Sequence, residues 1–113
     1  MSERPLDAIE RILDEIEDAD DVLRRAVAAL VTDPDTVWAG ICFLESGVLA
    51  LGPSAGAPDE ARRTRVPVMF EGGRVGELWV DGNANRELLE HVASRIAPHV
   101  LIGWDTGGEA WEP

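Results

Sequence analysis

The segment that most constrains the fold runs from Val66 to Asp81, which the sequence predicts to be two antiparallel strands joined by a tight turn. Apolar residues occur in both halves, and Gly72 and Gly73 lie between them. Glycine adopts the positive backbone φ of a two-residue hairpin turn without steric cost. We therefore expect a β-hairpin with Gly72 and Gly73 in its turn, and the rest of the chain must cover its apolar surface.

Helices are predicted at both ends of the chain. Apolar residues recur at three- and four-residue steps in residues 5–17 and 22–30, and again from about residue 85 to residue 101, which is the spacing of one helix face. Pro98 is expected to bend or restart the last helix, because proline lacks the N–H that a helix interior uses. Beyond that helix, residues 104–113 are predicted to form a loose tail.

Two further strands are predicted between the helices. Residues 37–44 are apolar on both alternating faces, as in a central strand covered on both sides, and residues 48–51 form a short second strand. The element order predicts an α+β fold, an antiparallel sheet of about four strands with the N- and C-terminal helices on one face. A length of 113 residues suits a single domain, with residues 1–19 as a helical extension and 20–103 as the core.

The charge of the chain is strongly acidic. The chain has 22 Asp and Glu residues and ten basic residues, all of them Arg, which gives a net charge of −12. Such a surface repels phosphate groups, so nucleic acids and anionic membranes are not expected partners. A salt-rich cytoplasm explains both the acidic excess and the missing Lys, whereas a GC-rich genome explains only the missing Lys. We favour a halophilic source.

Neither a signal sequence nor a run of 18 apolar residues is present, so a cytoplasmic location is expected. Cys42 is the single cysteine, which excludes an internal disulfide and a thiolate metal site. His91 and His99 lie eight residues apart with no acidic residue at a recognised metal-binding spacing. We therefore expect no metal and no cofactor.

An ordered series of short segments resembles a GAF domain and, more narrowly, the free methionine-(R)-sulfoxide reductases. The segments are Trp38-Ala39-Gly40-Ile41, Leu49-Ala50-Leu51-Gly52-Pro53, Val66-Pro67-Val68, Gly73-Arg74-Val75-Gly76-Glu77-Leu78 and Val80-Asp81. The resemblance covers roughly residues 20–101 and rests on the order of the segments, since none is specific alone. It implies the GAF fold.

Departures from the reductase pattern bear on activity. The resemblance implies a long connection before the Pro-containing strand, with cysteines that attack the sulfoxide and resolve the sulfenic acid. Here residues 54–65 are short and contain no cysteine. Arg63 stands where the reductases are expected to have Glu, and Trp79 replaces an expected Asp. The comparison therefore predicts that the fold is kept, that the reductase chemistry is lost, and that no residue is catalytic.

Candidate ligand-binding residues follow from the same region. Arg62, Arg63 and Arg65 on the shortened connection could clamp a small anion or a carboxylate, because Arg binds such groups in a bidentate manner. Surface pairing with nearby Asp and Glu is the simpler alternative in so acidic a chain. Trp38 and Trp79 could line a ligand hollow, although core packing is the commoner role for Trp.

A candidate dimer interface lies on the N-terminal helices. Ile9, Ile16, Leu23 and Leu30 stand seven residues apart, and Ile12 supplies a complementary position. This spacing suits an intermolecular coiled coil that makes a homodimer, and equally a helix packed on its own sheet.

The sequence thus predicts a non-catalytic, stand-alone GAF-like regulatory or sensory module that self-associates and binds a small ligand. One alternative is an uncharacterised small-molecule enzyme that uses the residual pocket. The other is a purely structural or interaction subunit.

Overall fold

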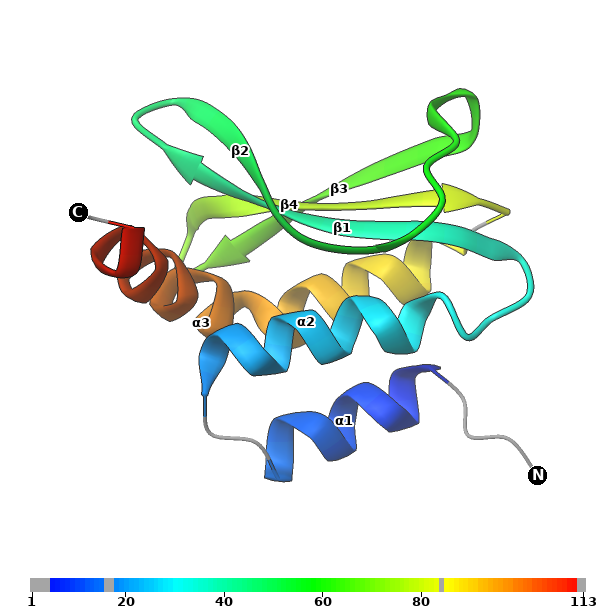
Figure 1. The fold of residues 1–113 in the computed structure, drawn as a ribbon, viewed down its shortest axis with the longest axis horizontal. Helices are drawn as coiled ribbons and strands as arrows, with labels where there is room; N and C mark the ends of the chain where they lie inside the picture. The colour runs from blue at the N-terminus through cyan, green and yellow to red at the C-terminus, as the bar shows by residue number, and fades with distance from the viewer. Residues whose placement is uncertain (1–4, 16–17, 84, 112–113) are drawn as a thin grey trace.

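A computed structural model describes residues 5–15, 18–83 and 85–111 of the chain. In chain order the elements are α1 (Pro5–Glu15), α2 (Ala19–Leu30), β1 (Thr36–Glu45), β2 (Val48–Gly56), the short 3₁₀ helix η1 (Glu60–Arg62), β3 (Arg63–Phe70), β4 (Gly73–Gly82) and α3 (Arg86–Trp111). Figure 1 shows the sheet on one side of α2 and α3, with α1 on their other side. The predicted α+β architecture is confirmed, with helices on one face of a four-stranded antiparallel sheet. No helix in these described ranges combines the length and apolarity needed to cross a membrane.

The strands lie in the order β2-β1-β4-β3, so β1 and β4 are central and β2 and β3 are edges. The predicted hairpin is present as β3 and β4, but its turn lies one residue earlier than expected. Glu71 and Gly72 have positive φ values of 51° and 84°, and Gly73 already pairs with Phe70. Strand β2 also continues to Gly56, well beyond the predicted end at residue 51.

The core lies between the sheet and helices α2 and α3. Alternate side chains of the strands point toward the helices, as the period of two requires. The fully buried residues include Leu23 and Val27 of α2, Ala39 and Ile41 of β1, Val66 and Val68 of β3, Leu78 and Val80 of β4, and Val92 and Ile96 of α3. Strand β1 is buried on its other face as well, at Trp38 and Cys42, as its doubly apolar sequence predicts.

The N-terminal helices belong to this core. Ile9, Leu23 and Leu30, which the heptad pattern assigned to a dimer interface, are buried inside the single chain. Ile12 is half-buried, and Ile16 lies outside the described residues. The Arg95 guanidinium also lies 2.7 Å from the Glu10 carboxylate, which joins α3 to α1. Helix α1 is therefore a layer of the domain, not an extension from it, and these three side chains are unavailable at the surface.

Helix α3 runs without interruption through Pro98 to Trp111. The sequence predicts a bend or restart at Pro98 and a loose tail over residues 104–113, of which residues 112–113 lie outside the described part of the chain. Pro98 removes one backbone hydrogen bond, but Ile96, Ala97 and Val100 around it are buried in the core. Packing of this segment therefore offsets the lost bond and lets the helix continue past Pro98.

Candidate functional site

The face of the sheet turned away from the helices carries four of the five residues predicted to bind a ligand. We call it the outer face; its described residues include Trp38, Gly40 and Cys42 of β1, Arg63 and Arg65 of β3, and Glu77, Trp79 and Asp81 of β4. The strand register brings them together, because Asp81 lies between Trp38 and Arg63 on the neighbouring strands, and Trp79 lies between Gly40 and Arg65. Directly paired residues share a face, so their side chains meet.

Glycine at position 40 shapes this face. A Cβ atom added to Gly40 would lie 2.4 Å from Cη2 of Trp38 and 3.1 Å from Cδ1 of Leu51. The Trp38 ring therefore lies over the backbone of β1 in space that any side chain at position 40 would occupy. This arrangement buries Trp38 and turns one face of its ring toward β3.

Arg63 occupies the space between the two tryptophan rings. Its Cζ lies 4.6 Å from the centroid of Trp38 and 5.1 Å from that of Trp79, within the range of cation–π attraction. Its Nε and Nη2 atoms donate to Oδ1 and Oδ2 of Asp81 at 2.7 and 2.9 Å. The Arg63 side chain is only 10% exposed, and that of Asp81 is fully buried. The hollow that Trp38 and Trp79 were predicted to line is therefore filled by an arginine of the same chain.

Asp81 also holds the connection between β2 and β3. Its Oδ2 accepts a hydrogen bond of 2.7 Å from the backbone N–H of Asp59, just before η1. Burial raises the pKa of Asp81, but hydrogen bonds from Arg63 and Asp59, together with the Arg63 charge, outweigh burial and bring the pKa below its ordinary value. The hydrogen bond to Asp81 raises the pKa of Arg63 in turn. The pair is therefore ionised throughout the physiological pH range.

Arg65 also lies against Trp79, with its Cζ 4.5 Å from the ring centroid. The ring is fixed by its Nε1–H, which donates to Oε1 of Glu77 at 2.7 Å, and Oε2 of Glu77 accepts from Arg74 at 3.2 Å. Within the described ranges, no carboxylate forms an ion pair with the exposed Arg65 side chain. Its guanidinium is thus available to an anion from solution.

Arg62, the remaining predicted ligand residue, does not join this group. It lies in η1, and its exposed guanidinium is 3.8 Å from the carboxylate of Asp59. This is the surface pairing expected as the simpler alternative to an anion clamp. The three predicted arginines therefore differ: Arg62 pairs at the surface, Arg63 is buried in the stack, and Arg65 is exposed.

Cys42 lies fully buried on the outer face, paired across the strands with Glu77 and Leu51. Burial raises the pKa of its thiol to about 11, and the Glu77 charge adds to this, against smaller opposing effects of Arg63 and Arg65. On the order of one thiol in ten thousand is then ionised at pH 7, and the thiolate is the reactive form. Cys42 is a poor nucleophile in this structure.

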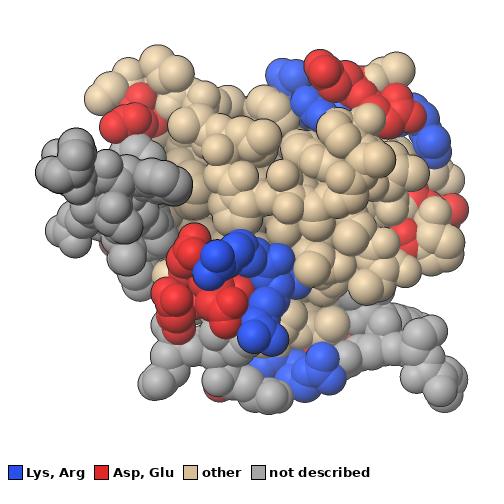
Figure 2. Space-filling view, viewed as in Figure 1, with Lys and Arg blue, Asp and Glu red and all other residues tan. Residues whose placement is uncertain are grey.

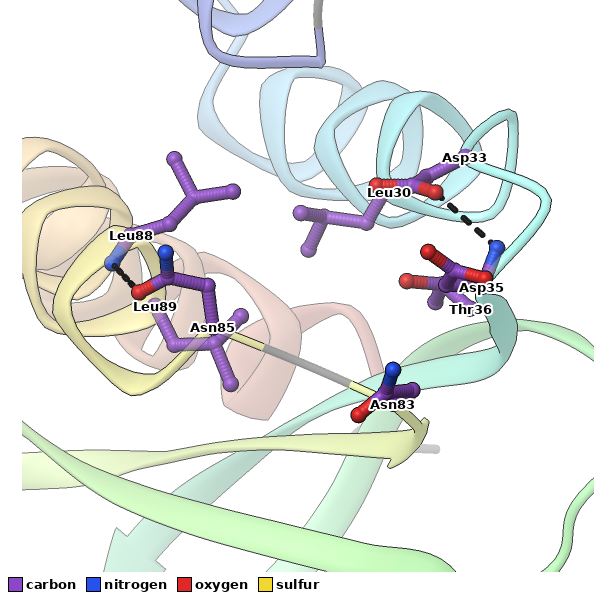
Figure 3. A pocket seen from close by; sticks show the side chains of 8 residues that line it. All are labelled: Leu30, Asp33, Asp35, Thr36, Asn83, Asn85, Leu88 and Leu89. Atoms are coloured by element: carbon purple, nitrogen blue, oxygen red, sulfur yellow. Dashed lines mark hydrogen bonds between the residues drawn. The ribbon is translucent and has the colours of Figure 1, made fainter.

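A separate hollow of about 150 Å³ lies beside the ends of α2 and β4 (Figure 3). Its lining residues are Leu30, Asp33, Asp35, Thr36, Asn83, Asn85, Leu88 and Leu89. Two of its polar side chains serve the backbone, since Asp33 accepts from the N–H of Asp35 and Asn85 accepts from the N–H of Leu88 at the start of α3. In the described part of the chain, no group of three His, Cys, Asp or Glu residues could hold a metal ion. This hollow was not predicted from the sequence, although Asp33, Asp35, Asn83 and Asn85 cluster in the two segments that form it.

Comparison with solved structures identifies the fold. No protein-family model matches this chain, and no curated protein matches it in sequence. The GAF domain of an Acinetobacter phosphoenolpyruvate-protein phosphotransferase superposes with a TM-score of 0.70 at 15% identity, over 96% of this chain and 99% of that one. The chain has the GAF fold.

Other structures with the GAF fold include sensors and enzymes. A protein described as a GAF sensor from Burkholderia vietnamiensis matches with a TM-score of 0.70 at 16% identity, over 88% of this chain and 91% of its own. The methionine sulfoxide reductase fRMsr of Staphylococcus aureus, solved with its substrate, matches with a TM-score of 0.65 at 18% identity, over 88% and 97% of the two chains. At identities this low, the structural matches establish the fold alone. The activity of this GAF-fold chain has to be inferred from its own residues.

Proposed function

We propose that this chain is a non-catalytic GAF-fold regulatory or sensory module that binds a small anionic ligand at Arg65 and Trp79 on the outer face. The observation that carries this proposal is the exposed Arg65 guanidinium, stacked 4.5 Å from the Trp79 ring and without an ion-pair partner in the described ranges. In a chain with 22 acidic residues, an arginine with no carboxylate partner among the described residues indicates a site kept open for an external anion.

The class of ligand follows from the two side chains. A guanidinium binds carboxylate or phosphate through two parallel hydrogen bonds, and the indole that holds it favours a ligand with an apolar part beside the charge. Arg63 is not available for this role, because its Nε and Nη2 atoms already donate to the Asp81 carboxylate. The outer face therefore suits a small carboxylate or phosphate ester that lies over Trp79 near the edge strand β3.

The buried thiol supports a role without catalysis. The resemblance to the sulfoxide reductases implies cysteines in the connection before β3, and residues 54–65 contain none. Cys42 is inside the sheet with its pKa raised to about 11. We expect no reduction of free methionine-(R)-sulfoxide above background. Turnover that disappears in Cys42→Ser would contradict the non-catalytic role and favour the alternative of an enzyme that uses the residual pocket.

The binding role is tested through the indole N–H signals of the tryptophans in nuclear magnetic resonance spectra, with the Trp79 signal assigned by Trp79→Phe. Acetate, inorganic phosphate, L-methionine and methionine-(R)-sulfoxide are titrated to millimolar concentration. We expect at least one of these compounds, each of which carries a carboxylate or phosphate group, to shift the Trp79 signal in a saturable way, and Arg65→Gln to abolish the shift. Arg62→Gln is the matched control, because its exposed guanidinium pairs with Asp59 and should leave binding unchanged. Absence of any saturable shift, or equal effects of the two variants, would contradict the proposed site.

A further inference from the structure

The two edges of the sheet differ sharply in their side chains. Edge strand β3 carries Arg63, Arg65 and Pro67, whereas edge strand β2 (Val48–Gly56) contains no charged residue. Val48 and Leu51 of β2 are 67% and 55% exposed. Charge and proline are the features that protect an edge strand from pairing with another chain, and the first half of β2 has neither.

The backbone of β2 presents a regular set of unpaired groups. Ser46 and Gly47 form a two-residue turn with φ values of 51° and 82°, so Glu45 and Val48 make the closely hydrogen-bonded pair that flanks such a turn. Hydrogen-bonded and non-hydrogen-bonded pairs alternate along an antiparallel ladder. The N–H and C=O groups of Ala50 therefore point toward β1, and those of Leu49 and Leu51 point to the open edge.

We propose that β2 is the self-association surface of this chain, and that it pairs antiparallel with β2 of a second copy across a two-fold axis at Ala50. In this register Leu49 of one copy lies opposite Leu51 of the other, and each such pair can exchange two backbone hydrogen bonds. The side chains of Leu49 and Leu51 lie on the same face of the sheet as Leu44 and Cys42, their partners in β1. The leucines of the two copies therefore cover each other across the new pair.

The absence of charged side chains on β2 favours a second copy as the occupant of this edge. A chain with a net charge of −12 repels its own copy wherever acidic side chains meet. Figure 2 shows a largely uncharged area between the charged groups on the face that Figure 1 also presents. In the register centred on Ala50, Val48 at the hairpin end of one copy lies opposite the uncharged Gly52 of the other, and Glu45, the partner of Val48 on β1, is one strand further away. The two Glu45 carboxylates are thus kept at opposite ends of the paired strands.

Pairing through β3 is disfavoured by the same reasoning. Two copies of β3 would bring Arg63 and Arg65 of one strand toward those of the other, and Pro67 cannot donate a backbone hydrogen bond. The helical surface predicted from the heptad pattern is not available, because Ile9, Leu23 and Leu30 are buried in the core. Association through β2 uses residues distinct from Arg65 and Trp79, so it does not rest on the proposed ligand site.

The oligomeric state of the full chain tests this inference, by light scattering after gel filtration in molar KCl at high micromolar concentration. We expect a dimer for the parent chain and at least tenfold weaker association for Leu51→Lys. Met69→Lys is the matched control, because Met69 is an exposed apolar residue (46%) on the other edge strand and should leave the dimer intact. If Leu51→Lys fails to fold, Ala50→Lys replaces it, since this exposed side chain would place two ammonium groups at the two-fold axis.

Amide hydrogen exchange separates this dimer from any other. The Leu49 amide points to the open edge, so it should exchange quickly in a dilute sample and become protected as the protein is concentrated. The Ala50 amide, bonded to β1, should be protected in both samples and serves as the internal control. A monomer at high concentration, or a dimer in which Leu49 still exchanges quickly, would overturn the inference.

Discussion

At the scale of single residues, the ion pair between Arg63 and Asp81 is the contact whose loss should destabilise the domain most. Asp81→Asn keeps the shape of the side chain but leaves the Arg63 charge between two indole rings without its counter-ion. Breaking a buried pair in this way typically costs about 3–5 kcal/mol of unfolding free energy. We expect a loss in this range in urea unfolding at pH 7. Asp59→Asn removes an exposed partner of Arg62 and should cost no more than about 1 kcal/mol.

The same pair sets how stability depends on pH. Since the folded-state pKa of Asp81 is below its unfolded value of about 3.9, its ionised form favours the folded state above that pH. This contribution declines once the pH drops under about 4, and it vanishes below the folded pKa. The difference in unfolding free energy between the parent and Asp81→Asn should therefore shrink between pH 7 and pH 3. An unchanged difference would show that the cost of Asp81→Asn does not arise from loss of the Asp81 charge.

At the scale of elements, the hairpin illustrates what the sequence could predict and what it could not. The two strands and the location of the turn follow from Gly72-Gly73 and the apolar residues on either side. The predicted turn, however, would pair Arg63 with Gly82. The observed turn at Glu71 and Gly72, together with a register shift at Val68 and Met69, pairs Arg63 with Asp81. A one-residue change in register reverses the face of a side chain, so the partner of Arg63 depended on details that glycine content does not specify.

The candidate site was predictable in part for the same reason. Alternation along β1, β3 and β4 places Trp38, Arg63, Arg65 and Trp79 on one face once the register is known. Their types indicated an anion or aromatic site, but not which arginine would be buried and which exposed. That division arises from a cross-strand contact with Asp81, and contacts between residues distant in the sequence are not encoded in local spacing.

The role of helix α1 was ambiguous for a different physical reason. A heptad pattern of apolar residues predicts a helix that buries one apolar face. The pattern does not indicate whether the surface that covers this face belongs to the same chain or to a second copy. Burial of Ile9 in the core predicts that Ile9→Ala costs about 2–5 kcal/mol of unfolding free energy, because it leaves a cavity. Ile12→Ala, at a half-buried position of the same helix, should cost clearly less. Equal costs in urea unfolding would place α1 outside the core.

At the scale of the whole molecule, the charge of −12 predicts that stability rises with salt. The surface ion pairs, such as Arg24 with Asp20, neutralise only some of the carboxylates. The remaining carboxylates repel one another in the folded state. Screening shortens the Debye length from about 30 Å at 0.01 M to about 3 Å at 1 M salt. The melting temperature should therefore rise from dilute buffer to molar KCl, as measured by circular dichroism.

A variant with fewer charges separates this repulsion from other effects of salt. Glu45, Glu71 and Glu87 are exposed, and replacing all three with Gln changes the net charge from −12 to −9. Since repulsion grows with net charge, the variant should melt at a higher temperature than the parent in dilute buffer, and the two should converge in molar KCl. The buried Arg63–Asp81 pair is shielded from ions in both proteins and should not contribute to the difference. A flat dependence on KCl in the parent would remove the inference of a halophilic source, and genome composition would then be the simpler cause of the absence of Lys.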